Sequence, residues 1–407
     1  MNLNSSFVLA KELKNPGIEH VDHLLFSSNG KFLVAAGDRD KVFIWNTETF
    51  RTEQVLENKQ WGQVSCLAWA YTELPSREPS TVLCVGNVFG GMSMFLMDSR
   101  SVKPFTERGT VIQLFTPNDI VENLVFDKIN GRLIASSHSG AVKMYSVDAV
   151  AGSANLVWEA PSNRPGIPTS VLFFGSTNEK LLSFGLENGD VCCRDASNGE
   201  VLWTKKLASG IGSAAISSDQ TVIIVNNLNN GNFDVYQTPD MSPLQTLAVG
   251  DSVTTHKYFI KQCRFIEGTK LSVCGSHTNK VHIFDVANNY VLQTLTSSPK
   301  EAHMTQAIAV TMAESRKVCI AASSNGFIYL WEKRSQPFVG VGETQTQPAN
   351  TLLHYARTNG PFIAFVMACT YANWAPYLFA LFAFLTSKAQ YYGLLNANEG
   401  NLENLEL

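Results

Sequence analysis

The sequence predicts an all-β fold, a seven-bladed β-propeller that is closed by an N-terminal strand and followed by one C-terminal helix. Three observations support this prediction. A short strand-like segment recurs seven times along the chain, and an orphan apolar segment precedes the first repeat. The turns before the recurring segments contain residues that tolerate positive φ. Repeats of roughly 20 to 50 residues, each too small to bury an apolar face alone, are typical of propellers and related arrays.

Each recurring segment alternates apolar and other residues and ends in an aromatic residue or a substitute for it. We predict that this end residue anchors its blade. The seven end residues are Trp45, Phe95, Tyr145, Arg194, Tyr236, Phe284 and Trp331. By subtraction of their numbers, neighbours in this series lie 42 to 50 residues apart. A near-constant period predicts seven structural units of one kind.

A hairpin turn precedes most of these segments. The turns include Ser139-Gly140, Asn188-Gly189, Asn230-Gly231 and Asn325-Gly326, and Gly and Asn favour the left-handed turn conformation. A further strand precedes each hairpin, as at residues 211–216, and a fourth follows the end residue after a polar turn. Four strands per unit make one propeller blade.

The last unit lacks a fourth strand, because Trp331 is followed by charged residues and a polar stretch with proline. Phe7, Val8 and Leu9 form the orphan apolar segment at the other end of the array. We predict that this segment pairs with the strand near Trp331. Such a pairing would close the ring and remove two exposed sheet edges.

Residues 21–46 resemble a WD repeat. They contain a strand, a Ser-Ser-Asn-Gly-Lys turn, a second strand, an Asp-Arg-Asp-Lys turn and a third strand that ends in Trp45-Asn46. The family's Gly-His pair is absent, and its hydrogen-bonded Asp-His-Ser-Trp network is matched only by His303, Ser323 and Trp331. The resemblance over residues 7–334 implies a non-enzymatic platform that binds other proteins. We expect its blades to depend on apolar packing between sheets.

The composition argues against nucleic acid, metal and catalytic functions. The net charge is -4 and no run of Lys or Arg exceeds two residues, so no nucleic-acid partner is predicted. No cysteine has CxxC or CxH spacing, and the strand-like surroundings of most predict buried thiols in a reducing compartment. We predict no active site, no cofactor, no metal and no small-molecule substrate. The eight cysteines are Cys66, Cys84, Cys192, Cys193, Cys263, Cys274, Cys319 and Cys369.

Three local features are interpreted as structural. His20 and His23 flank Asp22, and we predict them to be polar residues at a strand entrance rather than metal ligands. Asp38-Arg39-Asp40 resembles the start of a calcium loop but lacks the glycine and glutamate that would follow, so a solvated hairpin tip is predicted. Tyr71–Ser80 is interpreted as the longest loop, either a tolerated insertion or a docking loop.

The chain beyond the propeller is unusually apolar. We divide the sequence into a propeller (1–334), a polar linker (335–360), a hydrophobic segment (361–387) and a short acidic tail (388–407). No charged residue occurs from 362 to 386, which is long enough for a helix to span a bilayer. Pro376 and Asn373 near its middle argue against a single helix. The predicted membrane segment contains Phe362, Phe365, Trp374, Pro376, Phe379, Phe382 and Phe384.

Three arrangements of this segment stay open: a transmembrane helix, a helix packed on the propeller or a partner, and two half-length segments. More Lys and Arg precede it than follow it, which predicts a cytosolic propeller. Its place close to the end of the sequence resembles the tail-anchored arrangement. We therefore expect the cytosolic face of an internal membrane, with the endoplasmic reticulum as one candidate, and a soluble cytoplasmic protein as the alternative.

Two classes of function compete with a membrane-anchored adaptor for protein partners. The first is a regulator of a small GTPase, because the propeller exchange factor that starts coat assembly on the endoplasmic reticulum has a similar plan. That family's glycine-rich potassium-binding loop is replaced here by Asn15-Pro16-Gly17-Ile18. The second is a soluble assembly subunit whose C-terminal aromatic residues are buried in a larger complex.

Overall fold

The structure is a computed structural model of the 407-residue chain. The chain divides into two units, Met1–Gln336 and Pro337–Leu407. The residues that the structure describes all belong to the first unit, and they are 6–14, 20–72, 80–98, 101–148, 151–160, 166–250, 259–266, 268–296, 304–305, 307–311, 319–324 and 326–334.

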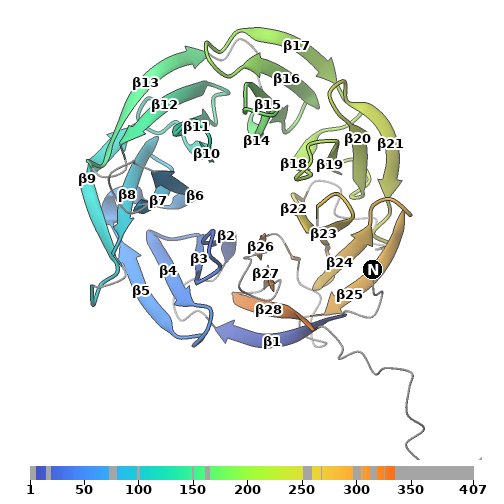
Figure 1. Cartoon of the computed structure of the whole chain (residues 1–407), viewed down its shortest axis with the longest axis horizontal. Coiled ribbons are helices and arrows are strands. Elements are labelled where there is room, and N and C mark those ends of the chain that lie inside the picture. Colours follow the sequence, from blue (N-terminus) through green and yellow to red (C-terminus); the bar gives the residue numbers. More distant parts are fainter. Residues whose placement is uncertain are drawn as a thin grey trace, which may run out of the picture. The chain divides into compact units, whose positions relative to one another are not determined.

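The described residues form seven four-stranded antiparallel sheets that stand around a central axis as the blades of a propeller (Figure 1). Blades 1 to 6 each use four consecutive strands, from β2–β5 to β22–β25, and blade 7 combines β26–β28 with β1. The predicted seven-bladed β-propeller is confirmed. The helical content of the described residues is one turn of 3-10 helix, η1 (Lys59–Trp61).

The strands occupy four positions in each blade, from the central axis outward. The innermost strands are β2 (Val21–Phe26), β6 (Val64–Thr72), β10 (Val121–Asp127), β14 (Pro168–Phe174), β18 (Ile211–Ile216), β22 (Cys263–Ile266) and β26 (Ile308–Thr311). The second strands are β3 (Phe32–Gly37), β7 (Ser80–Asn87), β11 (Arg132–Ser137), β15 (Lys180–Gly185), β19 (Val222–Asn227), β23 (Leu271–Gly275) and β27 (Cys319–Ser324). The third strands are β4 (Lys41–Asn46), β8 (Gly91–Met97), β12 (Val142–Asp148), β16 (Asp190–Asp195), β20 (Phe233–Gln237), β24 (Lys280–Asp285) and β28 (Phe327–Arg334). The outer strands are β5 (Thr52–Glu57), β9 (Phe105–Gln113), β13 (Ser153–Ala160), β17 (Val201–Lys206), β21 (Ser242–Leu247), β25 (Tyr290–Thr296) and β1 (Ser6–Lys14).

The hairpin tips adopt the backbone conformation that their sequence predicts. Gly140, Gly189, Gly231 and Asn279 all have positive φ, between 56° and 92°. At Gly189 a side chain would also collide with the backbone oxygen of Ser209. Glycine is required there for both reasons, and the turn brings β15 and β16 into register.

Blade 7 contains both ends of the propeller. Strand β1 pairs antiparallel with β28, so that Phe7 lies opposite Lys333, Val8 opposite Glu332 and Leu9 opposite Trp331. In Figure 1, β1 lies along the outside of β28. The paired strand is longer than the orphan apolar segment, since it runs from Ser6 to Lys14.

Glutamine side chains clamp the backbone of an outer strand at two blade junctions. Gln293 on β25 accepts a hydrogen bond from the Phe7 N–H (2.9 Å) and donates one to the Phe7 carbonyl (2.7 Å). Gln54 on β5 does the same with the Phe105 N–H (2.9 Å) and carbonyl (2.8 Å). The first clamp joins blade 6 to the closing strand, and the second joins blade 1 to blade 2.

Apolar packing joins the blades to one another. The seven clusters of buried apolar residues each lie between two neighbouring blades. The cluster between blades 1 and 2, for example, packs Phe32 and Ile44 of blade 1 against Leu83 and Phe95 of blade 2. Because the sheets bury both faces in this way, a central strand can be apolar along its whole length, as in β3, whose six residues are all buried.

The predicted C-terminal helix, with its membrane residues from Phe362 to Phe384, lies outside the described residues. Within the described part of the chain, no helix has the length and apolar character that crossing a bilayer requires. The membrane prediction therefore stays a prediction.

Candidate functional site

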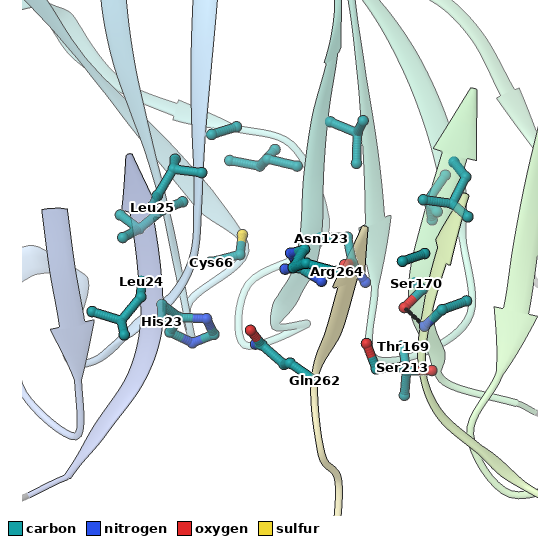
Figure 2. Close-up of a pocket in the computed structure, with 18 of the residues that line it drawn as sticks. His23, Leu24, Leu25, Cys66, Asn123, Thr169, Ser170, Ser213, Gln262 and Arg264 are labelled. Atoms are coloured by element: carbon teal, nitrogen blue, oxygen red, sulfur yellow. Dashed lines mark hydrogen bonds between the residues drawn. The ribbon is translucent and has the colours of Figure 1, made fainter. Parts of the chain in front are cut away.

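The innermost strands surround a channel along the propeller axis. Strands β2, β6, β10, β14, β18 and β22 all contribute to its lining, and its volume is about 880 Å³ (Figure 2). We define the N-terminal mouth as the end of the channel at which the innermost strands begin. Polar side chains gather near this mouth, whereas the far half is lined mainly by apolar side chains such as Leu25, Leu172 and Phe265.

Much of the polar lining near the N-terminal mouth is used to join blades. Ser65 donates to the Val121 carbonyl (2.7 Å), and Asn123 donates to the Pro168 carbonyl (2.6 Å). Similar contacts between a side chain and the backbone occur at four further blade junctions. They are Thr169 to the Ile211 carbonyl, the Lys261 N–H to Asn226, the Ile308 N–H to Gln262, and Ser323 to the Val21 carbonyl.

The Asp, Glu, His and Arg residues that line the channel are Asp22, His23, Glu122 and Arg264. Burial lowers the pKa of His23 to about 4, so its imidazole is neutral at pH 7. Burial also raises the pKa of Asp22 and lowers the pKa of the Arg264 guanidinium. These shifts show a channel wall that solvates charge poorly.

His23 lies near the start of β2, in keeping with the prediction of a polar residue at a strand entrance. Its ring lies in the channel, across from Gln262 (Figure 2). A β-bulge between Val21 and His23 shifts the alternation of the strand at this point. His20 precedes β2, and its backbone N–H donates to Asp38 (3.5 Å).

Six of the seven predicted anchor residues are buried between blades: Trp45, Phe95, Tyr145, Tyr236, Phe284 and Trp331. Arg194 is half-buried and donates from Nη1 to the Gly199 carbonyl (2.9 Å). The apolar cluster between blades 3 and 4 instead contains Ala196 and Trp158, whose indole N–H donates to the Ala196 carbonyl (3.0 Å). The indole of Trp158 thus occupies space that an aromatic residue at 194 would share.

The predicted remnant of the WD-repeat network differs from the structure. Ser323 donates to the Val21 carbonyl of blade 1 (2.7 Å) instead of joining Trp331 within its own blade. His303 lies outside the described residues. A buried polar pair that the sequence analysis missed occurs in blade 2, where the Trp61 indole N–H donates to Ser93 Oγ (2.9 Å).

Blades 3 and 4 share a buried carboxylate that the sequence analysis also missed. Asp127 is fully buried, and it accepts hydrogen bonds from Arg132 (2.9 Å), Asn130 (2.7 Å) and Asn178 (2.7 Å). Burial alone would raise the pKa of Asp127, but these hydrogen bonds outweigh burial and lower the pKa. Asn178 comes from blade 4, so the network crosses the junction.

The outer rim carries most of the exposed apolar surface. Among the described residues, ten of the fifteen large apolar side chains that are exposed lie on outer strands. We call the exposed residues of β13, β17, β21 and β25 the apolar rim, and they are Leu156, Val157, Val201, Leu202, Leu244, Tyr290, Val291 and Leu292. Leu9 on β1 and Val55 on β5 complete the ten, and β9 has none.

Most of the described cysteines are buried, as the sequence predicts. Cys66, Cys84, Cys193, Cys263 and Cys274 are buried, and the described cysteines are all free. Within the described residues, no three His, Cys, Asp or Glu side chains come together as metal ligands would.

The interpretation of Tyr71–Ser80 as the longest loop is wrong. Its two end residues lie in β6 and β7, and the connection from Leu247 to Cys263 is longer.

The architecture defines the class of the protein as a seven-bladed β-propeller. One comparison supports a WD repeat in the sequence, and a second supports the fold. Residues 11–46 match the family model described as WD domain, G-beta repeat. The β-propeller domain of Cps50 (Swd1) from Myceliophteria thermophila is a similar solved structure, with a TM-score of 0.60 and 14% sequence identity. That similarity covers 80% of this chain and 99% of the other, and at this identity it concerns the fold alone. No curated protein sequence matches this chain.

Proposed function

We propose that the chain is a non-catalytic platform for protein partners and that it works at the cytosolic face of an internal membrane. The observation that carries the first part is the apolar rim. Single exposed apolar side chains are normal on a protein surface. Here two consecutive pairs, Leu156-Val157 and Val201-Leu202, and one triplet at 290–292 occur on the outer strands of blades 3, 4 and 6, with Leu244 on blade 5 between the last two. Patches of this kind mark sites of association.

The rest of the propeller supports this role. Backbone pairing, apolar clusters and side-chain contacts fix each blade against the next. A scaffold held in this way positions loops and edges accurately without taking part in chemistry. The outer strands also have one unpaired edge each, which is available to a strand of a partner.

The sequence supports the membrane part of the proposal. Residues 362–386 contain no charge, and aromatic residues are frequent throughout this segment. An uncharged stretch of this length matches the hydrocarbon thickness of a bilayer when it is helical. The excess of Lys and Arg before the segment favours a propeller on the cytosolic side.

Cross-linking of the full-length protein in its own cells, followed by mass spectrometry, tests the platform. The variant Leu202→Glu places a charge on the apolar rim, and Thr106→Glu is the matched control on the polar outer strand β9. We expect partner cross-links to concentrate on β13, β17, β21 and β25 and to be lost in Leu202→Glu only. Equal cross-linking of both variants and the unchanged protein would contradict the proposal.

Carbonate extraction tests the membrane part. The full-length chain should stay in the membrane pellet, and a chain without residues 361–387 should be released. Recovery of the full-length chain in the soluble fraction would contradict anchoring and would favour a soluble assembly subunit.

A further inference from the structure

The channel contains a guanidinium that none of the described carboxylates neutralises. Arg264 is on β22 and its side chain extends into the channel toward Asn123 (Figure 2). Its Nη1 donates to the carbonyl of the preceding residue, Cys263 (2.9 Å). Among the described residues, Arg264 takes part in no ion pair, and it is the only Lys or Arg in the channel lining. The guanidinium is half-buried, and its donors other than this Nη1 contact are available to a ligand in the channel.

The two acidic residues of the lining do not offset this charge. Glu122 accepts a hydrogen bond from His138 (2.6 Å), a residue that does not line the channel. Asp22 is on β2, and burial raises its pKa despite the opposing charge interaction with His20. Neither carboxylate is within ion-pair distance of Arg264.

Further donors near Arg264 are left over from the contacts that join the blades. Gln262 uses Oε1 to accept from the Ile308 N–H (3.0 Å), which leaves its amide Nε2 to donate. Ser170 Oγ accepts from the Ala214 N–H (2.9 Å), which leaves the hydroxyl hydrogen to donate. Neutral His23 contributes one ring N–H from β2. The donors that remain therefore line the same channel as Arg264, and they suit an acceptor with negative charge.

We propose that the channel binds a carboxylate of a protein partner, an Asp or Glu side chain that enters through the N-terminal mouth and pairs with Arg264. This inference rests on the proposed function as a protein-binding platform and names the chemistry of one docking point. A planar carboxylate matches the fork of a guanidinium and can take two parallel hydrogen bonds from it.

Two observations favour a single carboxylate on a peptide over a polyanion. Asp22 and Glu122 line the same half of the channel, and their charge would repel a ligand with several negative groups. Phe259 and Ile260 precede β22 and are exposed by 41% and 37%, and Ile260 also lines the channel. Apolar surface beside the mouth suits the apolar neighbours of an acidic residue in an extended segment.

The probes for the test are pairs of acetylated, amidated pentapeptides with a central Glu or a central Gln between apolar residues. Their dissociation constants are measured by calorimetry on the full-length protein in detergent, beside sodium acetate and inorganic phosphate at equal ionic strength. The variants are Arg264→Gln, Arg264→Lys, and the surface control Lys41→Gln, which removes a cation on β4 that pairs with Glu57 on the outer strand β5.

We expect the unchanged protein and Lys41→Gln to prefer the Glu peptides by about tenfold or more, which is the effect of one charged hydrogen-bonded pair. Arg264→Gln should lose this preference, and Arg264→Lys should keep part of it. Because Arg264→Gln removes an uncompensated charge, its Tm should be equal to or above that of the unchanged protein, which shows that the loss is not due to unfolding.

Three results would overturn the proposal. They are no preference for Glu over Gln, a preference that survives in Arg264→Gln, and binding of acetate or phosphate as tight as that of the best peptide, which would assign the site to a free small anion. If one of these results is obtained while Leu202→Glu still abolishes partner cross-links, the platform function stands and only the proposed carboxylate site in the channel is ruled out.

Discussion

The two glutamine clamps make the same contact at very different distances along the chain. Gln54 holds the backbone of Phe105, which is 51 residues away, and Gln293 holds the backbone of Phe7, which is 286 residues away. Both phenylalanines are buried and both begin or nearly begin an outer strand. The closing strand therefore occupies the same structural position as the outer strand of an ordinary blade.

The closing strand is therefore held by the same pair of glutamine–backbone hydrogen bonds that joins two continuous blades. What differs is the entropic cost, since β1 must find β28 and Gln293 without a short connecting turn. Loss of the same kind of contact should consequently speed unfolding more at blade 7 than at a continuous blade. Four sets of variants compare the closing strand, the continuous junctions and the channel, and the largest loss of stability is expected when the closing strand is removed.

Removal of residues 1–14 should destabilise the propeller most. The deletion exposes the edge of β28 and removes the buried side chains of Phe7 and Leu13. We expect the free energy of unfolding to fall by about 5 kcal/mol or more, because each large buried side chain contributes roughly 3 kcal/mol. Chemical denaturation measures this loss, and Leu9→Ser, which changes an exposed residue of the same strand, is the control. An unchanged Tm after the deletion would rule out closure by β1.

Asp127→Ala should show how a continuous junction depends on side-chain chemistry. The substitution leaves the half-buried Arg132 and Asn178 without their carboxylate partner. Loss of one member of a buried charged network costs roughly 3 to 5 kcal/mol. The control is Asp219→Ala in the equivalent turn of blade 5, where the aspartate is exposed. Equal losses in the two variants, measured by urea denaturation, would show that burial of Asp127 is unimportant.

The two clamps can be compared directly through Gln293→Ala and Gln54→Ala. Each substitution removes two hydrogen bonds to backbone groups, which is a loss of about 1 to 2 kcal/mol. We expect similar changes in the equilibrium free energy, with faster unfolding in Gln293→Ala because β1 detaches more easily. If Gln293→Ala has no effect while Gln54→Ala does, the closing strand is not held as an ordinary outer strand.

The channel predicts a smaller, pH-dependent effect. The pKa of His23 is about 4 in the folded protein, against about 6.5 in an unfolded chain. Below pH 6.5 the imidazole of His23 is protonated in the unfolded state but stays neutral in the folded state. The free energy of unfolding contributed by neutral His23 is therefore fully present above pH 6.5 and declines as the pH falls toward 4. His23→Gln should flatten this decline in thermal melts. A decline of the same slope in the variant would show that His23 does not titrate as described.

The period of the repeats was sufficient to predict the blades. Trp45, Phe95 and Trp331 mark third strands because alternating apolar residues and an aromatic end recur at one spacing. The contacts between blades could not be predicted in this way. Gln293 looks like any polar residue of an outer strand, and its partner Phe7 is remote in sequence. Arg264 likewise has the alternation expected of a solvent-facing residue, and only the ring places it in a channel.

Disulfide trapping across the closing pair tests the central claim most directly. Val8 and Glu332 are opposite each other on β1 and β28, and partners in an antiparallel pair have Cα atoms about 4.5 to 5.5 Å apart, within reach of a disulfide. Under mild oxidation Val8→Cys with Glu332→Cys should form an intramolecular 8–332 disulfide, detected by peptide mass spectrometry, and Val8→Cys with Val201→Cys should form none. Absence of the 8–332 link, or its formation only between two molecules, would contradict a ring closed by its own N-terminal strand.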